Sequence, residues 1–228
     1  WEQSWSPAQF RSPALCDDVA VDNRQRMDAG LIYNPAEGAL LEEQTQALEL
    51  LYDFNATRPS QTELRATLLK QMFASVGEGC YVEPPLRANW GGRHVHLGDN
   101  VYANFNLTLV DDGPIRIGNN VMFGPNVVLA TAGHPVLPQL RSVAAQFNLP
   151  VRIGDNVWVG AGVLITPGVT IGDNSVIGAG SVVTRDIPPD VVALGSPCRV
   201  VREIGDHDRT YYSRDRLMDD SPENLLRL

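Results

Sequence analysis

A histidine interrupts the most regular part of this sequence. His134 lies in the stretch LATAGHPVLPQL, between Leu129 and Leu140, where a six-residue pattern stops and an irregular stretch begins. Imidazole gains and loses a proton near neutral pH, so a histidine held at the root of a loop can act as a general base. The alternative for His134 is a structural histidine at a loop corner.

Three arginines form a basic island near the C-terminus of an acidic chain. The chain has 18 basic and 27 acidic residues and a net charge of −9, yet Arg185, Arg199 and Arg202 lie close together in it. The guanidinium fork suits phosphate groups, so the island is a candidate site for a phosphorylated ligand. A solvated terminal segment is the plainer interpretation.

The stretch RHVH raises the question of a metal. His94 and His96 occupy alternate positions, so on a strand they would share one face and could bind zinc together with a third ligand. No third ligand is apparent in the sequence around them. We therefore interpret both as exposed strand residues and predict no metal site.

A six-residue repeat carries most of these candidates. Aliphatic residues recur at the first position and small or β-branched residues at the fifth, while Gly, Asn and Asp fill the places between. A period of six is too short for a helical repeat and fits one side of a three-sided parallel β-helix, with Gly, Asn and Asp at corners of positive φ. The break predicts a loop extruded from the prism at about Gly133 to Pro150. The first positions after the break are Ile153, Val159, Ile165, Ile171, Ile177 and Val183.

Two helices are expected before the repeat. Apolar residues recur at helical spacing from Leu40 to Phe54, and a second helix is marked by a Ser60–Glu63 capping box and a possible end at Gly77. We expect four parts in all. They are an irregular extension (1–25), a helical cap (26–80), a β-helix (81–205) and a C-terminal tail (206–228).

Composition excludes several classes of protein. The 228 residues are 43% hydrophobic, contain no apolar run long enough for a membrane span, and begin without the features of a signal peptide. Three widely spaced cysteines do not suggest a disulfide framework, and the negative charge disfavours nucleic acid. We expect a cytoplasmic protein that binds neither membranes nor nucleic acid.

Several motifs together resemble one family. VYANFNLTLVDD (101–112), TAGHP (131–135) and IGDNSVIGAGSVVTRDIPPDVVALGSPCRVVREI (171–204) are similar to sequences of the galactoside and maltose O-acetyltransferase group of hexapeptide-repeat proteins. The resemblance implies a mainly β fold, a left-handed parallel β-helix with an N-terminal helical cap and one extrusion loop. It also implies a homotrimer with ligand sites between subunits.

The same resemblance implies a reaction and its residues. An acetyl group would move from acetyl-CoA to a sugar hydroxyl by direct transfer in a ternary complex, with His134 as the general base. Asn104 would assist catalysis and line the acceptor pocket together with Tyr102, Asp112 and Asn89. The plainer alternatives are a repeat-corner asparagine for Asn104 and turn or surface residues for the others.

The resemblance also places coenzyme A. The pantetheine arm would follow a groove past Trp158, Ala161 and Ala179, and the phosphates would meet the end of the chain that carries the basic island. The residues assigned to the phosphates are Thr184, Arg185, Arg199 and Arg202.

The sequence departs from the family where the acceptor would bind. Asn34-Pro35-Ala36 replaces charged residues of the family cap, Ala145-Gln146 replaces bulkier loop residues, and Asn89-Trp90 replaces a small hydroxyl residue before an aromatic. The acceptor therefore stays open, and a hexapeptide acetyltransferase for a xenobiotic is an alternative. A non-catalytic β-helix used for assembly or ligand binding, and a metal hydratase like the γ-class carbonic anhydrases, are further alternatives.

Overall fold

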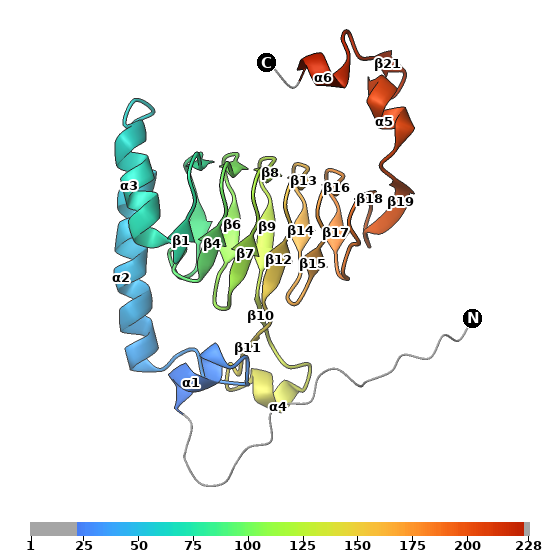
Figure 1. Ribbon diagram of the computed structural model, residues 1–228. Coiled ribbons are helices and arrows are strands. Elements are labelled where there is room, and N and C mark those ends of the chain that lie inside the picture. Colours follow the sequence, from blue (N-terminus) through green and yellow to red (C-terminus); the bar gives the residue numbers. More distant parts are fainter. Residues whose placement is uncertain (1–21, 226–228) are drawn as a thin grey trace, which may run out of the picture.

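The structure is a computed structural model that describes residues 22–225 of the chain. Parallel coils form its centre, with two helices standing at one end and a short mixed segment at the other (Figure 1). The predicted extension falls mostly outside the described residues, although its last residues belong to helix α1 (Asn23–Asp28). Asp22 caps this helix by accepting a hydrogen bond from the Gln25 N–H at 2.8 Å.

Three parallel sheets form the sides of the prism, and they confirm the predicted β-helix. The first contains β1 (Ser75–Val76), β4 (Val95–Leu97), β7 (Ile115–Ile117), β12 (Val151–Ile153) and β15 (Thr170–Ile171). The second contains β2 (Tyr81–Val82), β5 (Tyr102–Ala103), β8 (Met122–Phe123), β13 (Trp158–Val159), β16 (Val176–Ile177), β18 (Val191–Leu194) and the antiparallel β19 (Arg199–Glu203). The third contains β3 (Arg87–Ala88), β6 (Thr108–Val110), β9 (Val128–Ala130), β14 (Leu164–Ile165) and β17 (Val182–Val183).

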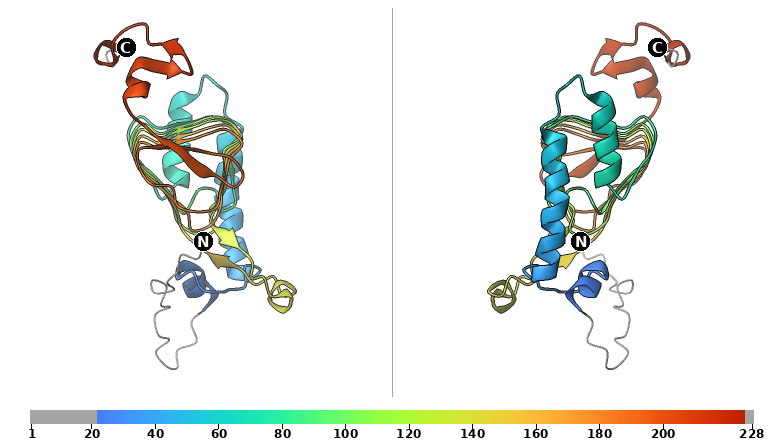
Figure 2. Two further views of the ribbon diagram at one scale, coloured as in Figure 1. Left: turned by 90° about the vertical axis from the view of Figure 1, so that its right-hand side faces the viewer. Right: turned by 90° about the vertical axis from the view of Figure 1, so that its left-hand side faces the viewer.

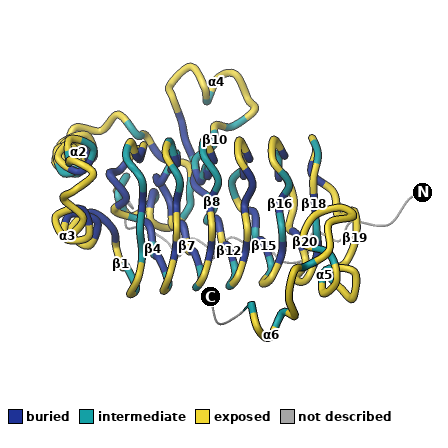
Figure 3. Tube along the Cα trace, turned by 90° about the horizontal axis from the view of Figure 1, so that it is seen from above, coloured by how far each residue is buried: buried dark blue, intermediate teal, exposed yellow. Residues whose placement is uncertain are grey.

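Aliphatic side chains fill the axis of the prism. Ile165, Ile171 and Ile177 come from successive strands and are fully buried, as the repeat predicts for its first positions. Viewed along the axis, the coils lie over one another (Figure 2), and burial follows the strands while the corners stay exposed (Figure 3). Burial of apolar surface therefore stabilises every coil against its two neighbours.

The corners use the residues that the repeat places there. Asn120, Asn156 and Asn174 have φ of 55°, 56° and 61°, and their amides form a ladder from coil to coil with bonds of 3.1 Å. Beside this ladder, a Cβ added at Gly154 would lie 2.1 Å from the Asp173 carboxylate. Glycine is therefore required where an Asp of the next coil folds over the corner.

The helical cap closes one end of the axis. Helices α2 (Gly38–Asn55) and α3 (Thr62–Met72) bury Phe54, Leu69 and Met72 in the same apolar cluster as the β-helix. The capping box expected at Ser60 is absent, since α3 begins after Gln61 and has no side-chain cap. The helix also ends before Gly77, because Ala74 N–H bonds to Val95 O at 3.0 Å and the chain enters the first sheet. No helix within residues 22–225 is long and apolar enough to cross a membrane.

The outward side chains give each sheet its own chemistry. The polar face, on the first sheet, consists of Ser75, His96, Arg116, Arg152 and Thr170. The aromatic face, on the second sheet, consists of Tyr81, Tyr102, Met122, Trp158, Val176 and Val192. The aliphatic face, on the third sheet, consists of Arg87, Thr108, Val128, Leu164 and Val182.

The remaining elements leave the prism. The extruded loop begins with β10 (Ala132–Gly133), carries α4 (Pro138–Arg141) at its tip and returns through β11 (Phe147–Asn148). The C-terminal segment contains α5 (Asp206–Thr210), β20 (Tyr211–Ser213), β21 (Arg216–Leu217) and α6 (Pro222–Leu225). The predicted extrusion loop is thus observed at the position where the repeat breaks.

The asparagine ladder predicts a difference between two substitutions. Asn156→Ala should destabilise the fold by ~1–2 kcal/mol, because alanine disfavours positive φ and both ladder hydrogen bonds are lost. Asn156→Gly loses the same bonds but tolerates the φ, so its melting temperature should lie between those of the wild type and the alanine variant. Equal melting temperatures for the two variants in thermal unfolding would show that backbone strain is not the reason for asparagine here.

Candidate active site

His134 projects from the root of the extruded loop. It follows β10, which pairs antiparallel with β11, and its Nδ1 lies 2.8 Å from Ala145 O. A carbonyl oxygen can only accept, so Nδ1 carries the proton and the neutral ring presents an unprotonated Nε2. The chain just before β11 supplies this carbonyl at Ala145 and therefore fixes the tautomer of an exposed imidazole.

A buried polar cluster holds this loop against the cap. Tyr33, Asp112, Gln146 and Asn148 are each less than a tenth exposed. Gln146 Nε2 donates to Asp112 Oδ1 at 2.9 Å and to the Tyr33 hydroxyl, and Asn148 Nδ2 donates to Asp112 O at 3.0 Å. The backbones of Tyr33 and Gln146 also exchange hydrogen bonds of 2.8 and 3.0 Å. Gln146, the residue after Ala145, is thus held in place by Tyr33, which lies more than 100 residues earlier in the chain.

Both carboxylate oxygens of Asp112 accept hydrogen bonds within this cluster. Its Oδ1 also accepts from Trp90 Nε1 at 3.3 Å, and its Oδ2 accepts from Asn89 Nδ2 at 2.9 Å. The structure therefore places Asp112 and Asn89 side by side, with the carboxylate already occupied by protein donors. Tyr33, Gln146 and Asn148 were missed by the sequence analysis as a group, because no local pattern connects residues so far apart.

Neighbouring Asp111 and the RHVH histidines have structural partners. Asp111 accepts from the N–H groups of Trp90 and Gly92 at 2.7 and 2.9 Å, and burial raises the pKa of its carboxyl group. His94 Nδ1 lies 2.6 Å from Asp111 O, while His96 Nδ1 lies 3.0 Å from Ser75 Oγ. Residues 22–225 contain no group of three His, Cys, Asp or Glu side chains that could hold a metal ion.

Most of the predicted site residues lie along two edges of the prism, while Tyr102 and Trp158 belong to the aromatic face. Asn104, Ala161 and Ala179 follow strands of the second sheet and form the edge between the aromatic and aliphatic faces. The edge between the aliphatic and polar faces carries Asn89, Asp112, His134, Thr184 and Arg185. The whole aliphatic face separates these two edges, so one chain does not bring Asn104 beside His134.

The first of these edges borders the exposed aromatic rings of the second sheet. Asn104 does not adopt the positive φ of the corner asparagines, which falls on Asn106 instead, and its Oδ1 accepts from Phe105 N–H at 2.8 Å. Tyr102 stacks on Tyr81 with ring centroids 6.4 Å apart, and Trp158 is 52% exposed. Asn104 is therefore not one of the corner asparagines with positive φ, and its amide nitrogen has no hydrogen bond within the described residues.

The basic island is divided in the folded chain. Thr184 and Arg185 line a hollow of about 580 Å³ on the second edge. Arg199 donates to Cys198 O at 2.7 Å, whereas Arg202 forms a bidentate pair with Asp208 through two bonds of 2.7 Å. That pair lowers the pKa of Asp208 to about 2. Arg185 is thus free to meet an anion, and Arg202 is engaged by the chain's own tail.

Tyr33 gives the cluster a pH signature. Burial raises the pKa of its hydroxyl to about 12, above the ordinary value of 10 that applies to the unfolded chain. Below pH 10 the contribution of protonated, buried Tyr33 to the free energy of unfolding is fully present. It is lost between pH 10 and 12, because the tyrosine of the unfolded chain ionises at a lower pH than that of the folded chain. The free energy of unfolding should fall by about 1 kcal/mol between pH 9 and 11. Chemical denaturation of Tyr33→Phe is the control, and an equal fall in that variant would contradict this origin.

Comparisons with known proteins agree with the fold and the motifs. A family model described as the maltose acetyltransferase hexapeptide capping motif matches residues 26–77, and one described as bacterial transferase hexapeptide (six repeats) matches residues 150–185. A galactoside O-acetyltransferase of Lactococcus lactis is 52% identical over 87% of this chain and 96% of its own length.

Solved structures extend the similarity to three dimensions. A galactoside acetyltransferase in complex with coenzyme A is 50% identical, with a TM-score of 0.83 over 87% of this chain and 98% of its own. A maltose O-acetyltransferase from Clostridium difficile 630 is 45% identical, with a TM-score of 0.80 over 82% of this chain and 100% of its own. The identity and coverage show that the chain belongs to the galactoside and maltose O-acetyltransferase group of hexapeptide-repeat acetyltransferases.

Proposed function

We propose that this protein transfers an acetyl group from acetyl-CoA to a hydroxyl group of a sugar, with His134 as the general base. Family membership supports the reaction class, and relatives named for galactoside and maltose acetylation support the acceptor class. The observation that carries the assignment of the base is the hydrogen bond from His134 Nδ1–H to Ala145 O at 2.8 Å. In the neutral imidazole it directs the lone pair to Nε2 on an exposed ring, which is the tautomer a general base needs.

The proposed transfer takes place directly in a ternary complex. Nε2 of His134 takes the proton of the acceptor hydroxyl as its oxygen attacks the thioester carbonyl carbon. The carbon–sulfur bond then breaks, and the imidazolium returns the proton to the departing thiolate of coenzyme A. The Nδ2 amide of Asn104 is our candidate donor to the oxyanion that forms between these steps.

We propose that the site is completed between copies of a homotrimer. Asn104 and His134 lie on different edges of one prism, and both can serve one reaction only if edges of two copies meet. The aromatic and aliphatic faces, with Met122 at 53% and Leu164 at 37% exposure, offer apolar surface for that contact. The polar face is the least suited to it.

The two edges also suit coenzyme A. Exposed Trp158, Ala161 and Ala179 would border the pantetheine arm, because small corner residues leave room for a thin chain. Thr184 and Arg185 would meet phosphate oxygens at the second edge, with Arg199 beyond them. Arg202 would bind phosphate only after its ion pair with Asp208 is broken.

The acceptor would be met by neutral donors. Since both carboxylate oxygens of buried Asp112 already accept hydrogen bonds from the protein, we propose that it holds Asn89, Trp90 and Gln146 in place and does not bind the sugar itself. The Tyr102 hydroxyl and the amide of Asn104 are then the candidate contacts to sugar hydroxyls. A cytoplasmic location is also part of the proposal, consistent with free thiols at Cys80 and Cys198 within residues 22–225.

His134→Ala tests the proposed base. Thiol release from acetyl-CoA with a panel of galactosides, glucosides and maltose should fall by about 10³-fold or more, while coenzyme A binding stays unchanged. His207→Ala, at another exposed histidine, is the matched control and should keep wild-type activity. An active His134→Ala enzyme would remove the mechanism. Release only with non-sugar acceptors would favour the xenobiotic alternative, and failure to bind coenzyme A would favour a non-catalytic β-helix.

A shared site predicts complementation between two inactive variants. His134→Ala and Asn104→Ala should each be severely impaired alone, but co-expressed subunits should regain about one quarter of the wild-type activity. Half of the subunits carry an intact His134 and the other half an intact Asn104. Random pairing therefore gives both intact residues to about one half times one half of the sites. Mixing the purified variants without subunit exchange is the control. No recovery in co-expressed trimers would mean that the two residues act within one chain or not at all.

A further inference from the structure

Two arginines stand side by side on the polar face. Arg116 at the centre of β7 is in register with Arg152 at the centre of β12, and both side chains are exposed. His96 on β4 and Thr170 on β15 occupy the flanking positions of the same row. The row thus presents two guanidinium groups and flanking polar side chains on a rigid, flat sheet.

Neither guanidinium group is neutralised within residues 22–225. No carboxylate forms an ion pair with Arg116 or Arg152, although the sequence holds 27 acidic residues. Like charges directly opposite each other on paired strands destabilise a sheet. Burial and the charge of Arg116 also lower the pKa of His96, so this imidazole adds little to the repulsion near neutral pH. An anion between the two arginines would remove that cost.

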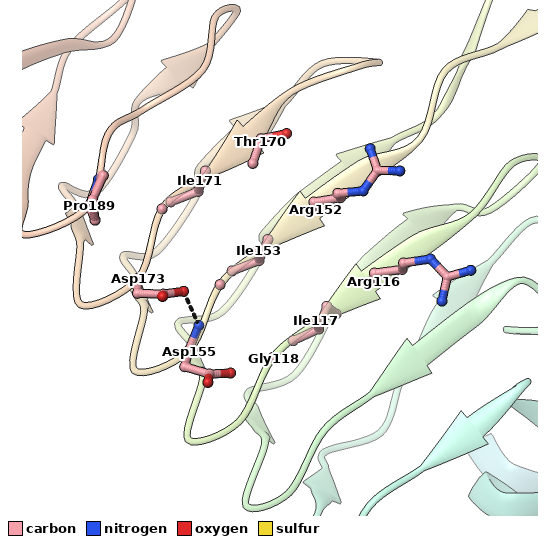
Figure 4. A pocket seen from close by; sticks show the side chains of 12 residues that line it. Arg116, Ile117, Gly118, Arg152, Ile153, Asp155, Thr170, Ile171, Asp173 and Pro189 are labelled. Atoms are coloured by element: carbon pink, nitrogen blue, oxygen red, sulfur yellow. Dashed lines mark hydrogen bonds between the residues drawn. The ribbon is translucent and has the colours of Figure 1, made fainter.

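The arginines border a hollow with two different ends. The hollow has a volume of about 490 Å³ and runs along the strands to the corner that carries Asp155 and Asp173. Figure 4 shows the two guanidinium groups projecting together at one end and the two carboxylates at the other. β12 ends at Ile153 and Asp155 lies in the turn that follows, so the Cα atoms of Arg152 and Asp155 are at most about 10 Å apart. The hollow is therefore cationic at one end and anionic at the other.

The carboxylates retain free acceptor capacity. Asp155 Oδ1 accepts from the Asn119 backbone N–H at 2.7 Å, and Asp173 Oδ1 accepts from the Asp155 N–H at 2.9 Å. Their second oxygens have no hydrogen bond within the described part of the chain. An ionised carboxylate accepts from hydroxyl donors but repels a second anion. This end of the hollow is therefore suited to the hydroxyl groups of a ligand and repels its anionic group.

We propose that this hollow on the polar face binds a sugar phosphate, with the phosphate between Arg116 and Arg152 and sugar hydroxyls on Asp155 and Asp173. Guanidinium forks match the oxygens of a phosphate, and about 10 Å suits the length of a phosphorylated hexose. A plain anion would leave the carboxylate end unused, and a neutral sugar would leave the arginines unneutralised. The site lies on a different face from the proposed acetyl transfer and does not depend on it.

Binding measurements on the full chain test the site directly. Glucose 6-phosphate, inorganic phosphate and glucose are titrated by NMR or calorimetry at constant ionic strength, without acetyl-CoA. Glucose 6-phosphate should bind more tightly than inorganic phosphate, and the double variant Arg116→Gln/Arg152→Gln should weaken its binding by about 10-fold or more. Binding of glucose should be the same in the double variant and in the wild type, since it lacks the phosphate.

Matched variants separate this hollow from other anion sites. Arg58→Gln, at an exposed arginine beyond the hollow, should leave binding unchanged. Asp173→Asn should fold, because an asparagine oxygen already accepts the backbone N–H at the equivalent corner, where Asn119 accepts from Asp99. This variant should bind glucose 6-phosphate more weakly and inorganic phosphate as tightly as the wild type. Acetyl transfer should stay at the wild-type level in the arginine double variant, so failure of this site and failure of the proposed reaction are distinguishable.

Three results would overturn the proposal. The first is an absence of glucose 6-phosphate binding to the wild type. The second is binding that survives in the double variant, or that is lost in Arg185→Gln, which would place the phosphate in the proposed coenzyme A groove. The third is equal affinity for inorganic phosphate and glucose 6-phosphate together with no effect of Asp173→Asn, because the carboxylate end would then have no role.

Discussion

Every coil must place an aliphatic side chain on the axis while its backbone bonds to the coils on both sides, and this is possible only if the chain turns sharply at each corner. Asn120, Asn156 and Asn174 supply the positive φ, and glycines such as Gly154 leave room for the Asp of the next coil. The corner chemistry fixes the repeat at six residues. A fixed repeat aligns the outward side chains of successive coils, so the three faces and their edges follow from it.

The extruded loop is released from this constraint and must be held in another way. Its return strand is fixed by Gln146, whose side chain bonds to Asp112 and Tyr33 in a buried cluster. Buried polar groups that are fully paired favour one arrangement strongly, since any alternative leaves a donor or acceptor unmet. The helical cap therefore does more than cover the axis. It holds the returning loop segment whose Ala145 carbonyl sets the tautomer of His134.

The three faces of the prism present different side chains to their surroundings. The aromatic and aliphatic faces carry apolar side chains, whereas the polar face carries Arg116 and Arg152 without carboxylate partners in the described chain. Apolar surface favours association with other copies, and unneutralised charge favours contact with water or anions. Reaction and ligand recognition can thus be assigned to different sides of one rigid prism.

The sequence by itself determined the β-helix, its helical cap and the position of its loop, because each of these depends on residues close together in the chain. The six-residue period reports the corners directly, and the break at His134 reports the loop. Helix ends were less well determined. The Ser60 box was wrong because the helix begins after Gln61, and the Gly77 stop was wrong because the backbone bond from Ala74 to Val95 O draws the chain into the first sheet earlier.

Only the tertiary structure decided which side chains meet. The hydrogen bonds to the Asp112 carboxylate come from Trp90, Gln146 and Asn89, and the ion pair of Arg202 depends on how the tail folds back onto it. The alignment of Arg116 with Arg152 depends on the loop between them leaving the repeat without shifting its register. A local pattern specifies backbone conformation, but contacts between distant segments depend on register and packing, which no short stretch of sequence contains.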